Sequence, residues 1–97
     1  MSEGNYLDPP APVLVDAKAT EVLRVWAGTD RLLLTLRTSW SDPAAWGIVL
    51  ADIARHVANA YESEGYGRAE QVEARVRQAF LAEWEEQTSE VERLRSS

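Results

Sequence analysis

The sequence predicts a small two-layer α+β domain in which a β-hairpin is followed by two antiparallel α-helices. Two short runs rich in Val, Leu, Thr and Trp surround a Gly-containing turn, which is typical of a hairpin. Two later stretches repeat apolar side chains at three- and four-residue steps, which is typical of amphipathic helices. With 97 residues and no cysteine, the chain can form only a small core without disulfides, so we expect a second copy to stabilise it.

The two ends of the chain are predicted to lie outside this domain. Residues 1–12 contain three prolines and little apolar surface, which predicts a flexible arm. Residues 13–16 follow Pro12 and are β-favouring, so they could add a third edge strand or a packed loop. The single domain is expected to cover residues 13–88, and the charged residues 89–97 are predicted to form a frayed tail.

The hairpin is predicted to pair residues 21–27 with residues 32–38. A two-residue turn would place Val25 opposite Leu32, whereas a turn two residues longer would place it opposite Leu34. Both registers bring the same side chains together, because side chains alternate between the faces of a strand. The face expected to cover the core consists of Leu23, Val25, Ala27, Leu32, Leu34 and Leu36.

The first helix is predicted within Trp40–Tyr61, with Asp42 as its N-cap and Pro43 at the first helical position. Gly47 lies inside this helix, which predicts close approach of a neighbouring backbone from the second helix or from another copy. Two glycines soon after it predict a left-handed cap, and a second amphipathic helix is expected over residues 68–88. The tryptophans expected in the core on these helices are Trp46 and Trp84.

The composition excludes several classes of function. Sixteen acidic and ten basic residues give a net charge of −6, which opposes binding to nucleic acid. No run of apolar residues reaches the length of a membrane span, and the acidic N-terminus does not resemble a signal peptide. We therefore expect a cytoplasmic protein with no nucleic-acid or membrane partner. Residues 20–40 are the only region that is not net acidic, with three arginines against Glu21 and Asp30.

The polar side of the first helix carries Asp52, His56 and Asn59, with His56 four residues after Asp52 and Asn59 three residues further on. A carboxylate beside an imidazole could orient a general base. No serine lies in a setting typical of a nucleophile, so no catalytic residue is assigned and enzyme activity is not expected. One His and one Asp supply too few ligands for a zinc site within one chain, so no metal or other cofactor is predicted.

The second face of the hairpin carries a different polar set, Arg24, Trp26, Thr35 and Arg37. Two guanidinium groups and an indole could bind a carboxylate or a phosphate. Arginine and tryptophan are also enriched at protein interfaces, so the same face could contact a second subunit or another protein. Of the two interpretations, we favour the interface.

The string SDPAAWGIVLADIARHVANAY, preceded by the hairpin, resembles a family of small uncharacterised bacterial proteins. The resemblance covers most of residues 13–88 and is carried by Trp46, Gly47, Asp52, His56 and Tyr61. It implies the fold and a bacterial, cytoplasmic setting but transfers no functional residue. The sequence therefore predicts a homodimeric interaction or assembly module without catalysis. The alternatives are a binder of, or enzyme on, a small anionic metabolite, and an acidic regulator of a basic partner.

Overall fold

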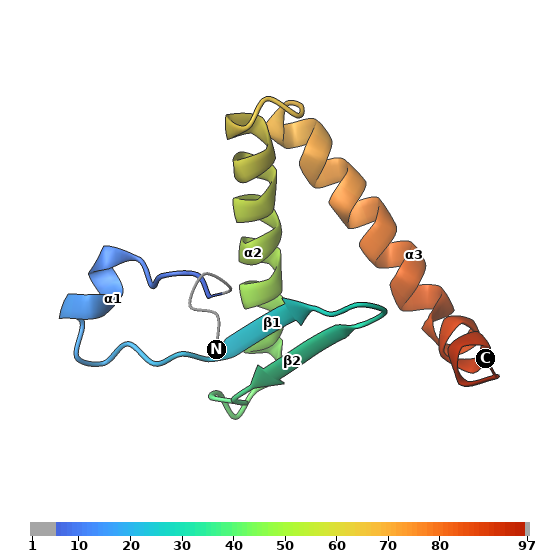
Figure 1. Cartoon of the computed structure of the whole chain (residues 1–97), viewed down its shortest axis with the longest axis horizontal. Helices are drawn as coiled ribbons and strands as arrows, with labels where there is room; N and C mark the ends of the chain where they lie inside the picture. The colour runs from blue at the N-terminus through green and yellow to red at the C-terminus, as the bar shows by residue number, and fades with distance from the viewer. Residues whose placement is uncertain (1–5, 97) are drawn as a thin grey trace. The chain divides into compact units, whose positions relative to one another are not determined.

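The computed structural model describes the backbone of residues 6–96 and the side chains of residues 6–86. Its elements are α1 (Ala11–Val15), β1 (Leu23–Ala27), β2 (Leu32–Leu36), α2 (Ala44–Ser63) and α3 (Ala69–Ser96). A hairpin followed by two helices confirms the predicted α+β class (Figure 1). The chain divides between Ser41 and Asp42 into two compact units, the first with α1 and the hairpin and the second with the helix pair. The single domain expected over residues 13–88 stays a prediction.

The short helix α1 lies where a third edge strand was possible. Pro12 suits the first turn of a helix because its fixed φ is close to helical and its missing N–H is not needed there. The backbone N–H of Val13 donates to the carbonyl of Pro10 at 3.0 Å, which closes that turn. Within the described residues the sheet contains only β1 and β2, so the possible edge strand over residues 13–16 does not form.

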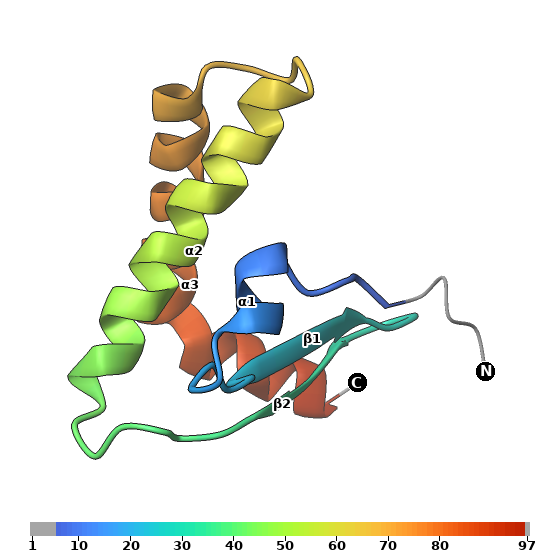
Figure 2. The ribbon, with the colours of Figure 1, turned by 90° about the vertical axis from the view of Figure 1, so that its left-hand side faces the viewer.

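The hairpin has the longer of the two possible turns. Val25 lies opposite Leu34, and β1 and β2 run antiparallel side by side (Figure 2). The N–H of Gly28 donates to the carbonyl of Arg31 at 2.8 Å, which closes the turn. A Cβ at Gly28 would lie only 2.8 Å from that same oxygen, so a side chain there would force the turn to shift.

The predicted core face of the hairpin is not buried. Val25, Leu34 and Leu36 are 50%, 55% and 49% exposed, and Leu32 is exposed as well. Leu23 is half-buried. The pairing is therefore one of the two registers that the sequence allows, and the first unit by itself leaves most of this face exposed. Alternation shows which side chains share a face, whereas burial also depends on what covers that face.

The first helix begins as predicted. The carboxylate of Asp42 accepts a hydrogen bond from the N–H of Ala44 at 2.9 Å. Pro43 already has helical dihedral angles, φ −61° and ψ −15°, so Asp42 acts as the N-cap and Pro43 occupies the first helical position. This bond satisfies one of the N–H groups that a helix N-terminus leaves without a partner.

The end of α2 is a left-handed glycine cap. Gly65 has a φ of +83°; its N–H donates to the carbonyl of Glu62, and the N–H of Tyr66 donates to the carbonyl of Tyr61, both at 3.0 Å. This pair of bonds defines the Schellman motif. The rings of Tyr61 and Tyr66 meet edge to face with centroids 6.0 Å apart, which supplies the apolar contact that often accompanies the motif. A carboxylate oxygen of Glu62 also accepts the N–H of Ala69 at 3.1 Å and so caps the start of α3.

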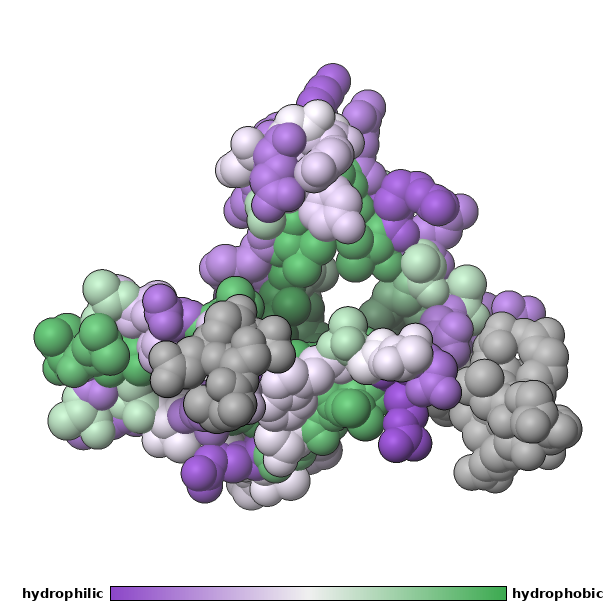
Figure 3. Space-filling view, in the orientation of Figure 1, coloured by the Kyte–Doolittle hydropathy of each residue, from purple (hydrophilic) through white to green (hydrophobic). Residues whose placement is uncertain are grey.

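The two long helices pack on each other near this connection and diverge toward their other ends (Figure 1). Ala58 of α2 is the only fully buried residue among those described, and Val72 and Val76 of α3 are half-buried. Hydrophobic side chains gather on the facing sides of α2 and α3 (Figure 3). None of the helices in the described part of the chain has the length and apolar character needed to cross a membrane.

The structure differs from two of the expectations for the helices. Nothing described lies within 4 Å of a Cβ built at Gly47, so close approach by the second helix is wrong. Trp46 is half-buried, but Trp84 is 66% exposed and is not a core residue; it stacks on Phe80 at a centroid distance of 5.7 Å. The backbone of α3 continues to Ser96, and the frayed tail predicted for residues 89–97 stays a prediction.

Candidate functional site

The polar set on α2 forms a surface pair. One ring nitrogen of His56, Nδ1, lies 2.8 Å from the backbone carbonyl oxygen of Asp52 and 3.5 Å from its carboxylate. Both side chains are well exposed, at 76% and 62%, and Asn59 is exposed too. Ion pairs at such exposed positions contribute little to stability, because water screens them. The geometry is that of two helix neighbours, and it brings no nucleophile to the imidazole.

Three residues of the hairpin set lie at the end of the hairpin opposite the turn, which we call the open end. The open end consists of the stretch before and at the start of β1, together with the end of β2 and the residues that follow it. Arg24 and Thr35 face each other across the strands, and Arg37 follows β2. Trp26 lies nearer the turn, opposite Leu33, and is half-buried. The structure therefore brings three of the four predicted residues together.

The two arginines at the open end form different interactions. Arg24 forms an ion pair through its Nε with the carboxylate of Glu21, and its guanidinium carbon lies 5.9 Å from the centroid of the Tyr6 ring. The hydrogen bond and the charge of Glu21 raise the pKa of Arg24. The positive charge of Arg24 is therefore already matched by a carboxylate.

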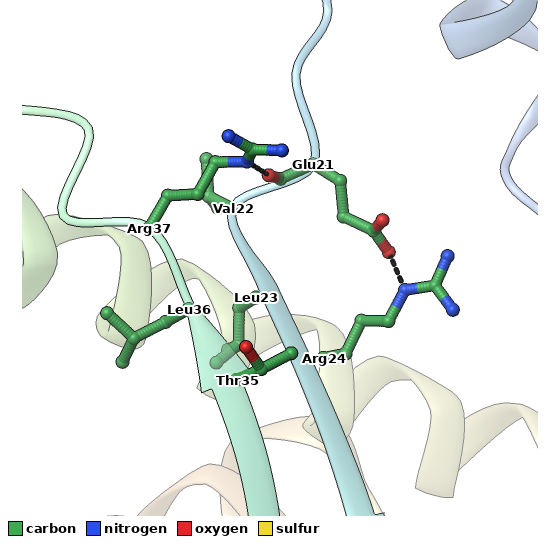
Figure 4. A pocket seen from close by; sticks show the side chains of 7 residues that line it. All are labelled: Glu21, Val22, Leu23, Arg24, Thr35, Leu36 and Arg37. Atoms are coloured by element: carbon green, nitrogen blue, oxygen red, sulfur yellow. Dashed lines mark hydrogen bonds and ion pairs between the residues drawn. The ribbon is translucent and has the colours of Figure 1, made fainter.

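Arg37 is anchored differently. Its Nε donates to the backbone carbonyl of Glu21 at 3.1 Å, and its backbone N–H donates to the carbonyl of Val22 at 2.9 Å. A carbonyl oxygen carries no net charge, so these bonds orient the guanidinium without neutralising it. Among the described side chains, no ion pair involves Arg37. Figure 4 shows the hydrogen bond from the Nε of Arg37 to the carbonyl of Glu21.

A shallow hollow of about 190 Å³ lies between these groups (Figure 4). Arg24, Thr35 and Arg37 contribute to its wall, along with Glu21 and three apolar residues of the strands. A carboxylate bound here would meet the carboxylate of Glu21, which repels it. This hollow therefore suits an anion less well than the sequence alone suggests.

A second, larger hollow of about 690 Å³ is also lined by Arg37. Lys18 and Thr20 precede β1, and Ser39 and Trp40 follow β2, and all four contribute to its wall. The sequence interpretation missed these four residues, because a hollow formed by two loop segments has no periodic pattern. One feature of the sequence could have pointed to this hollow, because Lys18 is the only lysine in the chain.

Comparison with known proteins identifies the family of the chain and a similar solved structure. A family model described as a domain of unknown function matches residues 6–88. A solved structure from the photosynthetic bacterium Rhodopseudomonas palustrus CGA009, provisionally described as a pyruvate dehydrogenase, is 31% identical with a TM-score of 0.69. The alignment covers 87% of this chain and 86% of that one. No curated protein matches.

Proposed function

We propose that this chain, which belongs to the family of the domain of unknown function DUF5076, is a homodimeric interaction module that has no catalytic activity of its own. The observation that carries the proposal is the apolar face of the hairpin, defined by Leu23, Val25, Ala27, Leu32, Leu34 and Leu36. Four of its large side chains are about half exposed or more. An exposed apolar face of this kind is typical of a surface that another protein covers.

A second copy suits this face because the face is uncharged. None of its six side chains is polar, so two copies related by a twofold axis could meet without placing like charges together. The opposite face carries Arg24, and Arg37 lies beyond it, so self-association there would bring cations close together. We therefore propose that the interface is the apolar face and not the second face, where the sequence suggested it.

The size of the chain supports the same proposal. Small domains bury a limited share of their surface, and disulfides cannot compensate here because the chain has no cysteine. Interfaces of obligate homodimers are apolar and resemble a domain core divided in two. Only Ala58 is fully buried among the described residues, so a dimer would supply core that the single chain lacks.

The proposal is tested by the mass of the full-length protein in solution. Sedimentation equilibrium should give twice 10.8 kDa over a wide range of dilution. A folded protein that sediments at 10.8 kDa would contradict the proposal, because the apolar face would then be covered within one chain. Circular dichroism of the same samples shows whether the protein is folded.

A second candidate function is the binding of a small anion. The observation that favours it is the guanidinium of Arg37, which is oriented by a carbonyl and is not neutralised. Pyruvate, which appears in the description of the relative, is a small carboxylate and is therefore the first anion to try. Binding should raise the melting temperature without changing the mass of the protein. If no anion raises the melting temperature, this candidate is excluded while the homodimer is not affected.

A further inference from the structure

The larger hollow at the open end combines positive charge with hydroxyl groups. Its two cations are Lys18 and Arg37, and no carboxylate lines it. Thr20, Thr38 and Ser39 supply hydroxyls. This is unusual for a chain with a net charge of −6. Its volume of about 690 Å³ lies within the range of small-molecule sites, which is roughly 300–1,000 Å³.

The guanidinium of Arg37 is held in place by a hydrogen bond before any anion binds. Its Nε is held by the carbonyl of Glu21 at 3.1 Å, which limits the movement of the group. A guanidinium offers a planar fork of N–H groups that matches the two oxygens of a carboxylate or phosphate. Because it is anchored beforehand, less conformational freedom is lost on binding.

The hydroxyls of Ser39 and Thr20 form long hydrogen bonds. Ser39 Oγ donates to the carbonyl of Arg37 at 3.4 Å, and Thr20 Oγ1 donates to the carbonyl of Lys18 at 3.5 Å. Bonds of this length are weak, so either hydroxyl could turn to a charged acceptor that approaches more closely. Ser39 also has a φ of +64°, the only positive value at a non-glycine residue in the described chain. Strained residues of this kind are often found at binding sites.

The carboxylate of Asp16 is bonded to the backbone of one residue that lines the hollow. An Asp16 side-chain oxygen accepts the backbone N–H of Lys18 at 2.9 Å. That bond uses the main chain of Lys18 and no ion pair joins the two side chains among the described contacts. Asp16 does not line the hollow. The ammonium group of Lys18 therefore stays available to the hollow.

We propose that this hollow binds a small anionic molecule through its carboxylate or phosphate group. Arg37 would bind two oxygens of the anion, Lys18 would supply the second positive charge, and the indole of Trp40 would line the less polar part of the site. The proposal rests on the second candidate function and names its site. It replaces Arg24, whose charge is matched by Glu21, with Lys18 as the partner of Arg37.

Because Lys18 is the only lysine, it can be labelled selectively. Reductive methylation with ¹³C-formaldehyde marks Lys18 and the terminal amine and keeps both positive charges. Pyruvate and inorganic phosphate are then titrated at constant ionic strength, with methyl pyruvate as the neutral control. The Lys18 methyl resonance should shift to saturation with at least one anion and should not respond to methyl pyruvate. A response equal to that of the neutral control would overturn the proposal.

Variants of the unlabelled protein locate the site by calorimetric titration. Lys18→Gln and Arg37→Lys should each weaken binding about 10-fold or more, because each removes charge-assisted hydrogen bonds. Arg37→Lys retains the charge, so it tests the planar fork while limiting the risk of misfolding. Arg24→Gln is the matched control and should change affinity less than about 3-fold.

The possible outcomes separate the two proposals. If binding is lost in Arg24→Gln but retained in Lys18→Gln, the protein binds an anion and the assignment to this hollow is wrong. If no anion binds to the folded wild-type protein, both the site and the second candidate function are wrong. The homodimer is tested by mass alone and does not depend on either result.

Discussion

Replacing Leu34 with alanine tests the apolar face most directly. Leu34 lies opposite Val25 and is 55% exposed, so about half of its surface is left for a partner to cover. Complete burial of a leucine contributes roughly 1.5–3 kcal/mol, and half of that is about 1 kcal/mol. A symmetric dimer contains two such side chains. The truncation should therefore weaken dimerisation by about 2 kcal/mol, or roughly 30-fold in Kd.

Leu33→Ala is the matched control for this variant. Leu33 is the neighbouring residue, is 45% exposed and faces the opposite side of the hairpin. Both truncations remove the same atoms and should lower the stability of the hairpin itself to a similar extent. Sedimentation equilibrium of the two variants then isolates the effect of the face. An equal or larger loss of dimer in Leu33→Ala would refute the reasoning and would place the interface on the second face.

Four further changes follow from contacts within the two units. Asp42→Ala removes the N-cap of α2 and should lower the free energy of unfolding by about 1 kcal/mol in urea titrations, whereas no change would exclude the cap. Gly28→Ala should lower the melting temperature because its Cβ meets a carbonyl, whereas Gly47→Ala, which meets nothing described, should raise stability by roughly 0.5–1 kcal/mol. A loss in Gly47→Ala would indicate a partner backbone at that position. His56→Ala should change stability by less than about 0.5 kcal/mol, since the pair with Asp52 is exposed; a larger loss would show that it is covered in the dimer.

The elements that the sequence predicts correctly are those set by short-range chemistry. Asp42 and Pro43 predict the start of α2 because a cap needs only neighbouring residues. The glycines after α2 predict its end for the same reason. The two faces of the hairpin were predictable, because a change of two residues in the turn length leaves the alternation of side chains unchanged. The turn length itself depends on the hydrogen bond from the N–H of Gly28 to the carbonyl of Arg31.

The predictions that fail depend on distant groups. The apolar residues after Pro12 are β-favouring, yet a strand needs a partner edge, and none pairs with them in the described chain. Trp84 lies on an apolar stripe, but its burial depends on whether another element covers it, so the stripe alone overestimates that burial. For the candidate site, the sequence identified Arg24 and Arg37 but could not show that Glu21 neutralises only the first.

The partners in each unit are neighbours along the chain. β1 pairs with β2 across a four-residue turn, and α2 packs on α3 across the segment capped by Gly65. Contacts of low sequence separation form quickly, because only short loops must close. The hairpin precedes the helix pair along the chain. If the protein is the proposed homodimer, we expect subunit association to be the slow step. Refolding monitored by tryptophan fluorescence should accordingly show a late phase that accelerates with protein concentration.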